Sequence, residues 1–314
     1  MTEFKKVAYI FPGQGAQYTG MGQDVFSDSP SARAIFEQAD RSLGFSLSQI
    51  CFNGPDDELI KTINVQPAIV AISIALLSAA KEYVGSEYFP KPYCIAGHSL
   101  GEYTALAAAG VLTISETICL ARERGRLMHQ AGQINPGAMA AIIGLDEKTL
   151  AEICSKTETY IANYNCPGQM VISGKAENIE KAGEMAKTKG AIRVIPLQVS
   201  GAFHTPLMSL AAQGLSDYIN GVNIKDADVP IVANTSAEAI TSSDSIKQEL
   251  INQLCRSVQW QHSVEYMIND GVDTFIEIGP GKVLCGLIKR INKEVRTINI
   301  CDIESIKKLD FASA

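Results

Sequence analysis

The stretch from Tyr93 to Tyr103 constrains this chain more than any other, because it joins a short apolar run to a Gly-x-Ser-x-Gly turn and then to helix-favouring sequence. We predict a strand, a sharp turn and a helix, with Ser99 at the turn. Gly97 and Gly101 lack a Cβ, so strand and helix can approach closely and leave the serine hydroxyl exposed. A chance match in a small-residue turn is the alternative, but the flanking strand and helix favour a nucleophile whose oxyanion the helix N-terminus can stabilise.

Composition and charge exclude several classes of protein. The chain has 314 residues, of which 46% are hydrophobic and 19% charged, as in ordinary globular proteins. Its formal net charge of −7 argues against general nucleic-acid binding. We find no signal-peptide pattern and expect no run long and apolar enough to cross a bilayer, so we expect a cytoplasmic protein. The eight cysteines lack a C-x-x-C pair and predict reduced thiols rather than a disulfide or zinc framework.

The first strand and the loop after it suggest a second part of the site. Residues 7–11 are a compact apolar run, typical of a sheet covered on both faces, and residues 12–17 form a glycine-rich loop. This loop lacks the Lys-Ser/Thr ending of a P-loop and the spacing of a dinucleotide fingerprint. In an open α/β sheet it would lie at the ligand-binding edge, where the Gln14 N–H can complete an oxyanion hole with that of Leu100. A simple turn is the alternative.

Helical patterns place an arginine among apolar residues. We predict helices over residues 31–43 and 67–83, with Gln66 either capping the second helix or facing the site. A T-x-x-E capping box at residues 113–116 opens a further helix that runs to about residue 130. Arg124 falls on the apolar side of that helix, so it needs an anion. Either a protein carboxylate pairs with it, or it binds a substrate carboxylate through its planar fork.

From residue 137 the pattern changes to a β-α-β-β-α-β order that is typical of a ferredoxin-like lobe. We therefore predict an α/β fold in two parts. An α/β-hydrolase-like core with a parallel sheet spans residues 1–131 and 198–314, and a small ferredoxin-like subdomain spans residues 132–197. A cleft between the two parts is a natural substrate site.

Of the four histidines, His204 lies in a loop downstream of the serine, where a general base can reach it across the fold. His98 lies inside the nucleophile turn, and we expect the other two on the surface: His129 and His262. The C-terminal third predicts a strand at residues 230–232, helices near residues 245–256 and 261–267, and a strand at residues 274–278. It does not identify an acid that orients the histidine, because Asp273 and Glu277 also fit a purely structural role.

Taken together, these segments resemble the ordered motif set of malonyl-CoA:acyl-carrier-protein transacylases. The resemblance covers essentially the whole chain, and the combination is far more specific than any single motif. Its motifs are Phe11 to Gln17 (FPGQGAQ), Gly97 to Tyr103 (GHSLGEY), Arg124 to Arg126 (RGR), Asn163 to Gln169 (NYNCPGQ), Gly201 to His204 (GAFH), Val258 to Trp260 (VQW) and Glu277 to Leu284 (EIGPGKVL). Ala16 replaces a serine that is commoner in the family, in a loop where only the backbone is invoked.

The resemblance implies a ping-pong acyl transfer that supplies extender units for fatty-acid synthesis. Ser99, activated by His204, would attack the thioester of malonyl-CoA while the N–H groups of Gln14 and Leu100 stabilise the oxyanion. Coenzyme A would leave, and the phosphopantetheine thiol of acyl-carrier protein would take the malonyl group. The resemblance implies no metal and no redox cofactor.

The resemblance also assigns the residues that orient the histidine and that select the acyl group. A main-chain carbonyl at the position of Gln259 would orient the histidine in place of a carboxylate, and Arg124 would bind the malonyl carboxylate. Phe203 would crowd a branched C2 atom, so malonyl is favoured over methylmalonyl. The remaining pocket residues that we expect are Gln66, His98, Asn163 and Asn165.

The carrier partner is acidic in this family, so we expect a basic patch near the cleft, either on the small lobe or near the C-terminus: Lys187, Lys189 and Arg193, or Lys289, Arg290 and Lys293. We expect a monomer that binds neither nucleic acid nor membrane. The alternatives are a trans-acting malonyl acyltransferase of a polyketide synthase, a serine thioesterase or esterase, and a non-catalytic scaffold that binds carrier protein. Retention of Ser99, Arg124 and His204 argues against the scaffold.

Overall fold

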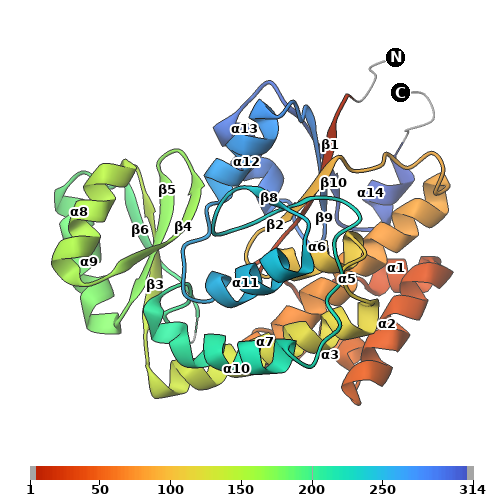
Figure 1. Cartoon of the computed structure of the whole chain (residues 1–314), viewed down its shortest axis with the longest axis horizontal. Coiled ribbons are helices and arrows are strands. Elements are labelled where there is room, and N and C mark those ends of the chain that lie inside the picture. The colour runs from red at the N-terminus through yellow and green to blue at the C-terminus, as the bar shows by residue number, and fades with distance from the viewer. Residues whose placement is uncertain (1–4, 200, 310–314) are drawn as a thin grey trace.

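The computed structural model describes residues 5–199 and 201–309 and contains two sheets flanked by helices (Figure 1). Side chains alternate across strand β1 (Val7–Phe11): Val7, Tyr9 and Phe11 pack in one hydrophobic core, and Ala8 and Ile10 pack in another. The first strand is therefore covered on both faces, as predicted.

The larger sheet has six strands in the order β10-β9-β1-β2-β7-β8, and all neighbours are parallel except β7 and β8. Because β1 and β2 are parallel neighbours, the loop after β1 and the serine turn after β2 leave the sheet at the same edge. The other strands are β2 (Cys94–Gly97), β7 (Ile231–Val232), β8 (Ala239–Ile240), β9 (Thr274–Ile278) and β10 (Arg296–Ile300).

Helices cover both faces of this sheet (Figure 1). Those before the serine turn are α1 (Gln23–Asp28), α2 (Pro30–Leu43), α3 (Leu47–Asn53), α4 (Asp56–Leu59) and α5 (Thr62–Val84). Those after it are α6 (Gly101–Ala108), α7 (Ile114–Ile134), the 3₁₀ turn η1 (Pro206–Met208), α10 (Ser209–Ile219), α11 (Ser243–Gln253), α12 (Trp260–Asn269), α13 (Val283–Ile291) and α14 (Ile303–Lys307). Helix α7 begins at the predicted capping box, in which Thr113 and Glu116 hydrogen-bond reciprocally.

The second sheet belongs to a small lobe with its own apolar core, on the left of Figure 1. Its four strands are antiparallel, in the order β4-β5-β3-β6. The predicted element order is confirmed: β3 (Ala138–Ile143), α8 (Glu147–Thr157), β4 (Tyr160–Cys166), β5 (Gln169–Gly174), α9 (Ala176–Thr188) and β6 (Arg193–Pro196).

The two lobes are hydrogen-bonded to each other along the edge strand β4. The backbone N–H of Tyr164 donates to the carbonyl of Val258 at 2.9 Å, and the N–H of Val258 donates to the carbonyl of Ala162 at 2.8 Å. The Ser257 hydroxyl adds a bond of 2.6 Å to the carbonyl of Ile161. Residues 257 and 258 are thereby fixed against the small lobe.

Helix α5 corrects two expectations. It begins at Thr62, five residues before Pro67, and it tolerates this proline because the carbonyl of Ile63, which Pro67 leaves without its helical donor, accepts a hydrogen bond of 2.8 Å from Arg122. The expectation that no segment is long and apolar enough to span a bilayer is also wrong, since α5 meets both criteria. However, 89% of its most apolar window is buried inside the protein, as in the core helix of a globular domain.

Sequence analysis did not predict β8, α13, β10 or α14 in the C-terminal third, and strand β10 shows the reason. It lies at the edge of the larger sheet and is only partly buried along most of its length, so its sequence lacks a clear apolar run. All eight cysteines lie in the described ranges and are free thiols.

Close packing of α5 against α7 yields a stability prediction. Alanine normally stabilises a helix interior relative to glycine by about 0.5–1 kcal/mol. At Gly125, however, an added Cβ would lie 2.6 Å from the carbonyl oxygen of Thr62 on α5. We therefore expect Gly125→Ala to lower the free energy of unfolding by about 1–3 kcal/mol.

The matched control is Gly286→Ala in α13, where an added Cβ meets nothing within 4 Å. This variant should raise the free energy of unfolding by up to about 1 kcal/mol. Urea denaturation of both variants measures the difference. Stabilisation of both proteins would contradict close packing at Gly125.

Candidate active site

Ser99 occupies a strained turn between β2 and α6. Its φ is 50°, in the left-handed region that side chains rarely adopt. The turn is tight because of the two glycines: a Cβ at Gly97 would lie 1.9 Å from the carbonyl carbon of Gly101, and one at Gly101 would lie 2.0 Å from the carbonyl oxygen of Phe11. The predicted strand-turn-helix around the serine is confirmed.

Two buried polar residues brace this turn. The Asn234 side chain accepts a hydrogen bond of 2.7 Å from the N–H of Ser99 and donates one of 2.7 Å to the carbonyl of Gly97. Glu102, in the first turn of α6, accepts from the N–H of Asn234 at 2.9 Å and from its side-chain amide at 3.1 Å. Burial raises the pKa of Glu102 well above its usual range, and the nearby Glu249 raises it further.

Ser99 and His204 are within hydrogen-bond distance, as predicted. The serine Oγ lies 2.8 Å from the histidine Nε2, and the histidine Nδ1 lies 2.7 Å from the main-chain carbonyl of Gln253. A carbonyl can only accept, so Nδ1 carries the proton and Nε2 is free to accept the serine proton. Burial, and secondarily the positive charge of Arg124, lower the pKa of His204 to about 3.

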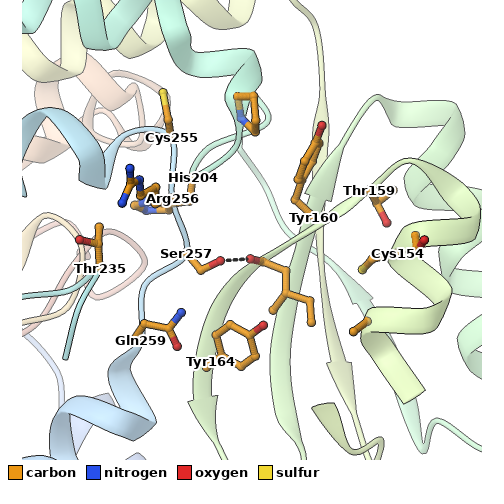
Figure 2. Close-up of a pocket in the computed structure, with 14 residues that line it drawn as sticks. Cys154, Thr159, Tyr160, Tyr164, His204, Thr235, Cys255, Arg256, Ser257 and Gln259 are labelled. Atoms are coloured by element: carbon orange, nitrogen blue, oxygen red, sulfur yellow. Dashed lines mark hydrogen bonds between the residues drawn. The ribbon is translucent and has the colours of Figure 1, made fainter. Parts of the chain in front are cut away.

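The assignment of the orienting carbonyl to Gln259 is wrong, because Gln253 supplies it. The N–H of Gln259 donates to the carbonyl of Asn234 at 2.7 Å. Figure 2 shows Gln259 beyond Ser257 and away from His204. The error has a physical reason: Gln253 ends α11, and the non-periodic segment that follows gives no sequence signal for which carbonyl turns toward the histidine.

Neither acidic candidate contacts the histidine. Glu277 is buried and accepts from the N–H groups of Leu284 and Cys285 at the start of α13, at 3.0 and 2.7 Å. Asp273 accepts from the hydroxyl of Thr274 at 2.9 Å. Both residues therefore have structural roles, which agrees with the main-chain orientation of His204.

Arg124 is 1% exposed and points into the site from α7. Its guanidinium donates to Gln66 at 2.8 Å, to Gln253 at 2.8 Å and to the Ser99 hydroxyl at 3.2 Å, and it lies over the Tyr103 ring at 5.1 Å. Each of these partners is uncharged, and the Nε atom has no hydrogen-bond partner in the described part of the chain. Sequence analysis left two partners open for Arg124, a protein carboxylate or a substrate carboxylate. No carboxylate of the described residues pairs directly with it, so the first alternative is excluded there.

A cavity of about 110 Å³ brings most of the predicted site together. The site residues that line it are Gln14, His98, Ser99, Leu100, Arg124, Asn163, Phe203 and His204. Gln66 reaches this group through Arg124. The N–H of Leu100 lies at the start of α6, where the helix dipole favours negative charge.

A second cavity of about 280 Å³ shares Gln14, His98 and Asn163 with the first, so the two adjoin. Its other walls combine amides with apolar side chains of α13 and the small sheet, including Asn165, Gln169, Val171, Val283, Leu284 and Leu287. The ring of His98 is fixed by a contact of 2.8 Å with Asn165 and packs against Trp260. We call these two adjoining cavities the channel; they extend from Ser99 toward α13 and the small lobe.

A third cavity of about 490 Å³ is lined by Cys255, Arg256, Ser257 and Gln259 among other residues (Figure 2). Tyr160 and Tyr164 line it from the small lobe, and Arg256 lines it from the larger one. His204 lines both this cavity and the one at Ser99. His204 therefore lies between two cavities.

The buried site residues that sequence analysis did not predict include three polar side chains: Glu102, Asn234 and Gln253. Each had a weak signal in the sequence. Glu102 is the one charge in an otherwise apolar and alanine-rich helix start, and Asn234 follows the strand adjacent to the serine strand. Gln253 lies three residues after Leu250 and one before Leu254, on the apolar side of its helix.

A histidine-paired serine on a strained strand-to-helix turn, beside a buried arginine, defines a serine enzyme of the acyl-transfer or hydrolytic class. Residues 8–308 match the model of the acyl transferase domain. The chain belongs to this acyl transferase family.

Individual relatives agree. The malonyl CoA-acyl carrier protein transacylase of Bacillus subtilis is 46% identical over 96% of this chain and 95% of its own. The structure of an acyl-carrier-protein S-malonyltransferase from Bartonella henselae is 41% identical, with a TM-score of 0.92 over 96% of this chain and 97% of its own. A malonyl-transacylase solved in complex with its type II polyketide acyl-carrier protein is 37% identical, with a TM-score of 0.91 over 96% and 98%.

The low pKa of His204 predicts an unusual pH profile. A histidine of ordinary pKa near 6.5 would be about 97% protonated at pH 5. The neutral fraction, which alone can act as a general base, would be about 30-fold lower than in a fully neutral histidine. Because the pKa of His204 is lowered to about 3, its neutral form persists through this range. We expect the rate of Ser99 modification by phenylmethanesulfonyl fluoride to change less than about threefold between pH 7 and pH 5.

Mass spectrometry of the sulfonylated protein measures this rate, with Ser99→Ala as the unmodified control. A fall of about 30-fold with a midpoint near pH 6.5 would show that His204 titrates normally.

Proposed function

We propose that this enzyme transfers the malonyl group from malonyl-CoA to the phosphopantetheine thiol of acyl-carrier protein. The observation that carries the proposal is the buried Arg124, which lies 3.2 Å from the nucleophile and has only uncharged partners. A buried cation without a counter-charge in direct contact is costly, and a substrate carboxylate relieves that cost. The names of the relatives support the same substrate.

The chemistry follows from the site. His204 Nε2 accepts the Ser99 proton as Oγ attacks the thioester carbonyl, and the N–H groups of Gln14 and Leu100 are the proposed donors to the oxyanion. As the tetrahedral intermediate collapses, the carbon–sulfur bond breaks and the thiol of coenzyme A leaves with the proton from the imidazolium. The thiol of the carrier protein then attacks the malonyl-serine ester by the same steps in reverse, and it regenerates the serine.

The channel suits the substrate arm. Phosphopantetheine is a narrow chain with two amides, and the second cavity offers amide side chains at Asn163 and Asn165 among apolar walls. Phe203 is 5% exposed and lines the cavity at Ser99, where it would crowd a branched acyl group. Fatty-acid synthesis is the proposed pathway. A polyketide carrier is the second candidate, because one structural relative was solved with such a carrier protein.

We also propose that the small lobe is ferredoxin-like and that the larger one is an α/β-hydrolase-like core. The strand order β4-β5-β3-β6 supports the first assignment, and the parallel strands with the serine turn support the second. Because α7 extends to Ile134, we place the first boundary after that residue rather than at residue 131.

Intact-protein mass spectrometry tests the function. We expect a malonyl adduct on the wild-type enzyme and none on Ser99→Ala. We expect Arg124→Ala to lower the ratio of malonyl to acetyl loading by about 100-fold or more, because the substrate carboxylate would be buried unpaired. Methylmalonyl-CoA should load more slowly than malonyl-CoA. Free malonate accumulating without an adduct or an acceptor would identify a hydrolase instead.

The acidic carrier partner leads to a charge-reversal prediction. Helix α13 lines the channel, and Arg290 on it donates to Gln169 and to the carbonyl of Pro167 at the channel rim. We expect Arg290→Glu with Lys293→Glu to lower kcat/KM for carrier protein about tenfold at low salt and less at high salt. The small-lobe alternative is tested by Lys187→Glu with Arg193→Glu.

Lys148 is exposed on α8 and belongs to neither cluster, so Lys148→Glu is the control for the reversal of a positive charge elsewhere on the surface. Transfer that is insensitive to salt and to reversal of both clusters would contradict an electrostatic docking surface.

A further inference from the structure

Gln253 contacts more of the site than any role assigned above requires. Its main-chain carbonyl accepts from His204, but its side chain also accepts from Arg124 at 2.8 Å and donates to the main-chain carbonyl of Ser99 at 3.0 Å. The same side-chain nitrogen donates to a carboxylate oxygen of Glu102. The side chain is fully buried, so these contacts fix its position.

The polarity of this amide is determined by its neighbours. A guanidinium can only donate, so the end of the Gln253 amide that faces Arg124 must be the oxygen. A main-chain carbonyl can only accept, so the end that faces Ser99 and Glu102 must be the NH₂ group. No other orientation satisfies both ends. The amide oxygen is therefore held toward one Nη of the arginine, while Gln66 accepts from the other Nη at 2.8 Å.

Glu102 reinforces this orientation from behind. One of its oxygens accepts from the two nitrogens of Asn234, and the other accepts from Gln253. Asn234 in turn holds the N–H of Ser99 at 2.7 Å. A chain of hydrogen bonds thus runs from the nucleophile turn through Asn234, Glu102 and Gln253 to the arginine.

We propose that Gln253 is a positioning residue for acyl-group selection: its side-chain amide aims the Arg124 fork at the substrate carboxylate, and Glu102 fixes the direction of that amide. The inference rests on the proposed malonyl transfer and adds a second determinant of its selectivity. Gln253 orients the general base through its main chain and the carboxylate receptor through its side chain, so a substitution of the side chain separates the two effects.

The first test is Gln253→Met, which keeps the main-chain carbonyl and the approximate volume but removes the amide. We expect the ratio of kcat/KM for malonyl-CoA to that for acetyl-CoA, measured by acyl-enzyme formation, to fall by at least about tenfold. The fall should appear mainly as a higher KM for malonyl-CoA. Gln248→Met, an exposed glutamine on the same helix, is the matched control and should leave the ratio unchanged.

The second test is Glu102→Gln, which has almost the same shape. The N–H of Asn234 requires an oxygen at its end of residue 102, so the new NH₂ group would face the NH₂ group of Gln253. Two donors cannot hydrogen-bond to each other, so the Gln253 amide would lose its orientation. We expect the same loss of selectivity, although no cavity is made.

A double-mutant cycle shows whether the loss of malonyl selectivity in Gln253→Met depends on Arg124. In the Arg124→Ala background, Gln253→Met should change the ratio less than about twofold, because its target is absent. Equal losses for malonyl and acetyl in Gln253→Met, or a wild-type ratio in Glu102→Gln, would overturn this inference alone. Failure of the wild-type enzyme to form a malonyl adduct would overturn the proposed function and this inference with it.

Discussion

A guanidinium buried without a carboxylate in contact is the constraint around which this site is built. Four helices converge on it: α7 carries Arg124, α5 brings Gln66, α11 brings Gln253, and α6 places the Tyr103 ring over the cation. These neighbours supply dipoles and a π face but no directly bonded negative charge. The protein thus solvates the arginine well enough to fold and leaves it attractive to an anionic group next to Ser99.

The proposed nucleophile depends on an equally tight arrangement. Ser99 is held in a left-handed conformation because the glycines on either side let α6 approach β1 and β2 closely, and because Asn234 ties its N–H to the carbonyl of Gly97. Strain of this kind persists only when the surroundings over-determine it. The polar residues behind the turn are therefore part of the catalytic structure, although none of them contacts the reacting atoms in the steps derived above.

The sequence predicted what local patterns encode. The serine turn has a fixed spacing, the inward face of Arg124 follows from helical periodicity, and the small-lobe elements follow in order from their apolar patterns. It failed where the answer depends on tertiary contacts. The carbonyl that orients His204 comes from the end of one helix rather than from Gln259, and the pairing of Glu102 with Gln253 joins residues 151 positions apart. No periodicity encodes such contacts.

The hydrogen bonds between β4 and residues 257–258 also couple the two lobes mechanically. They join the two lobes beside the third cavity, which Ser257 and His204 both line. The same segment follows closely on Gln253, whose main-chain carbonyl accepts from His204. A displacement of the small lobe would therefore be transmitted to the end of α11, so the position of one lobe and the orientation of the histidine in the other are coupled through a few residues of backbone.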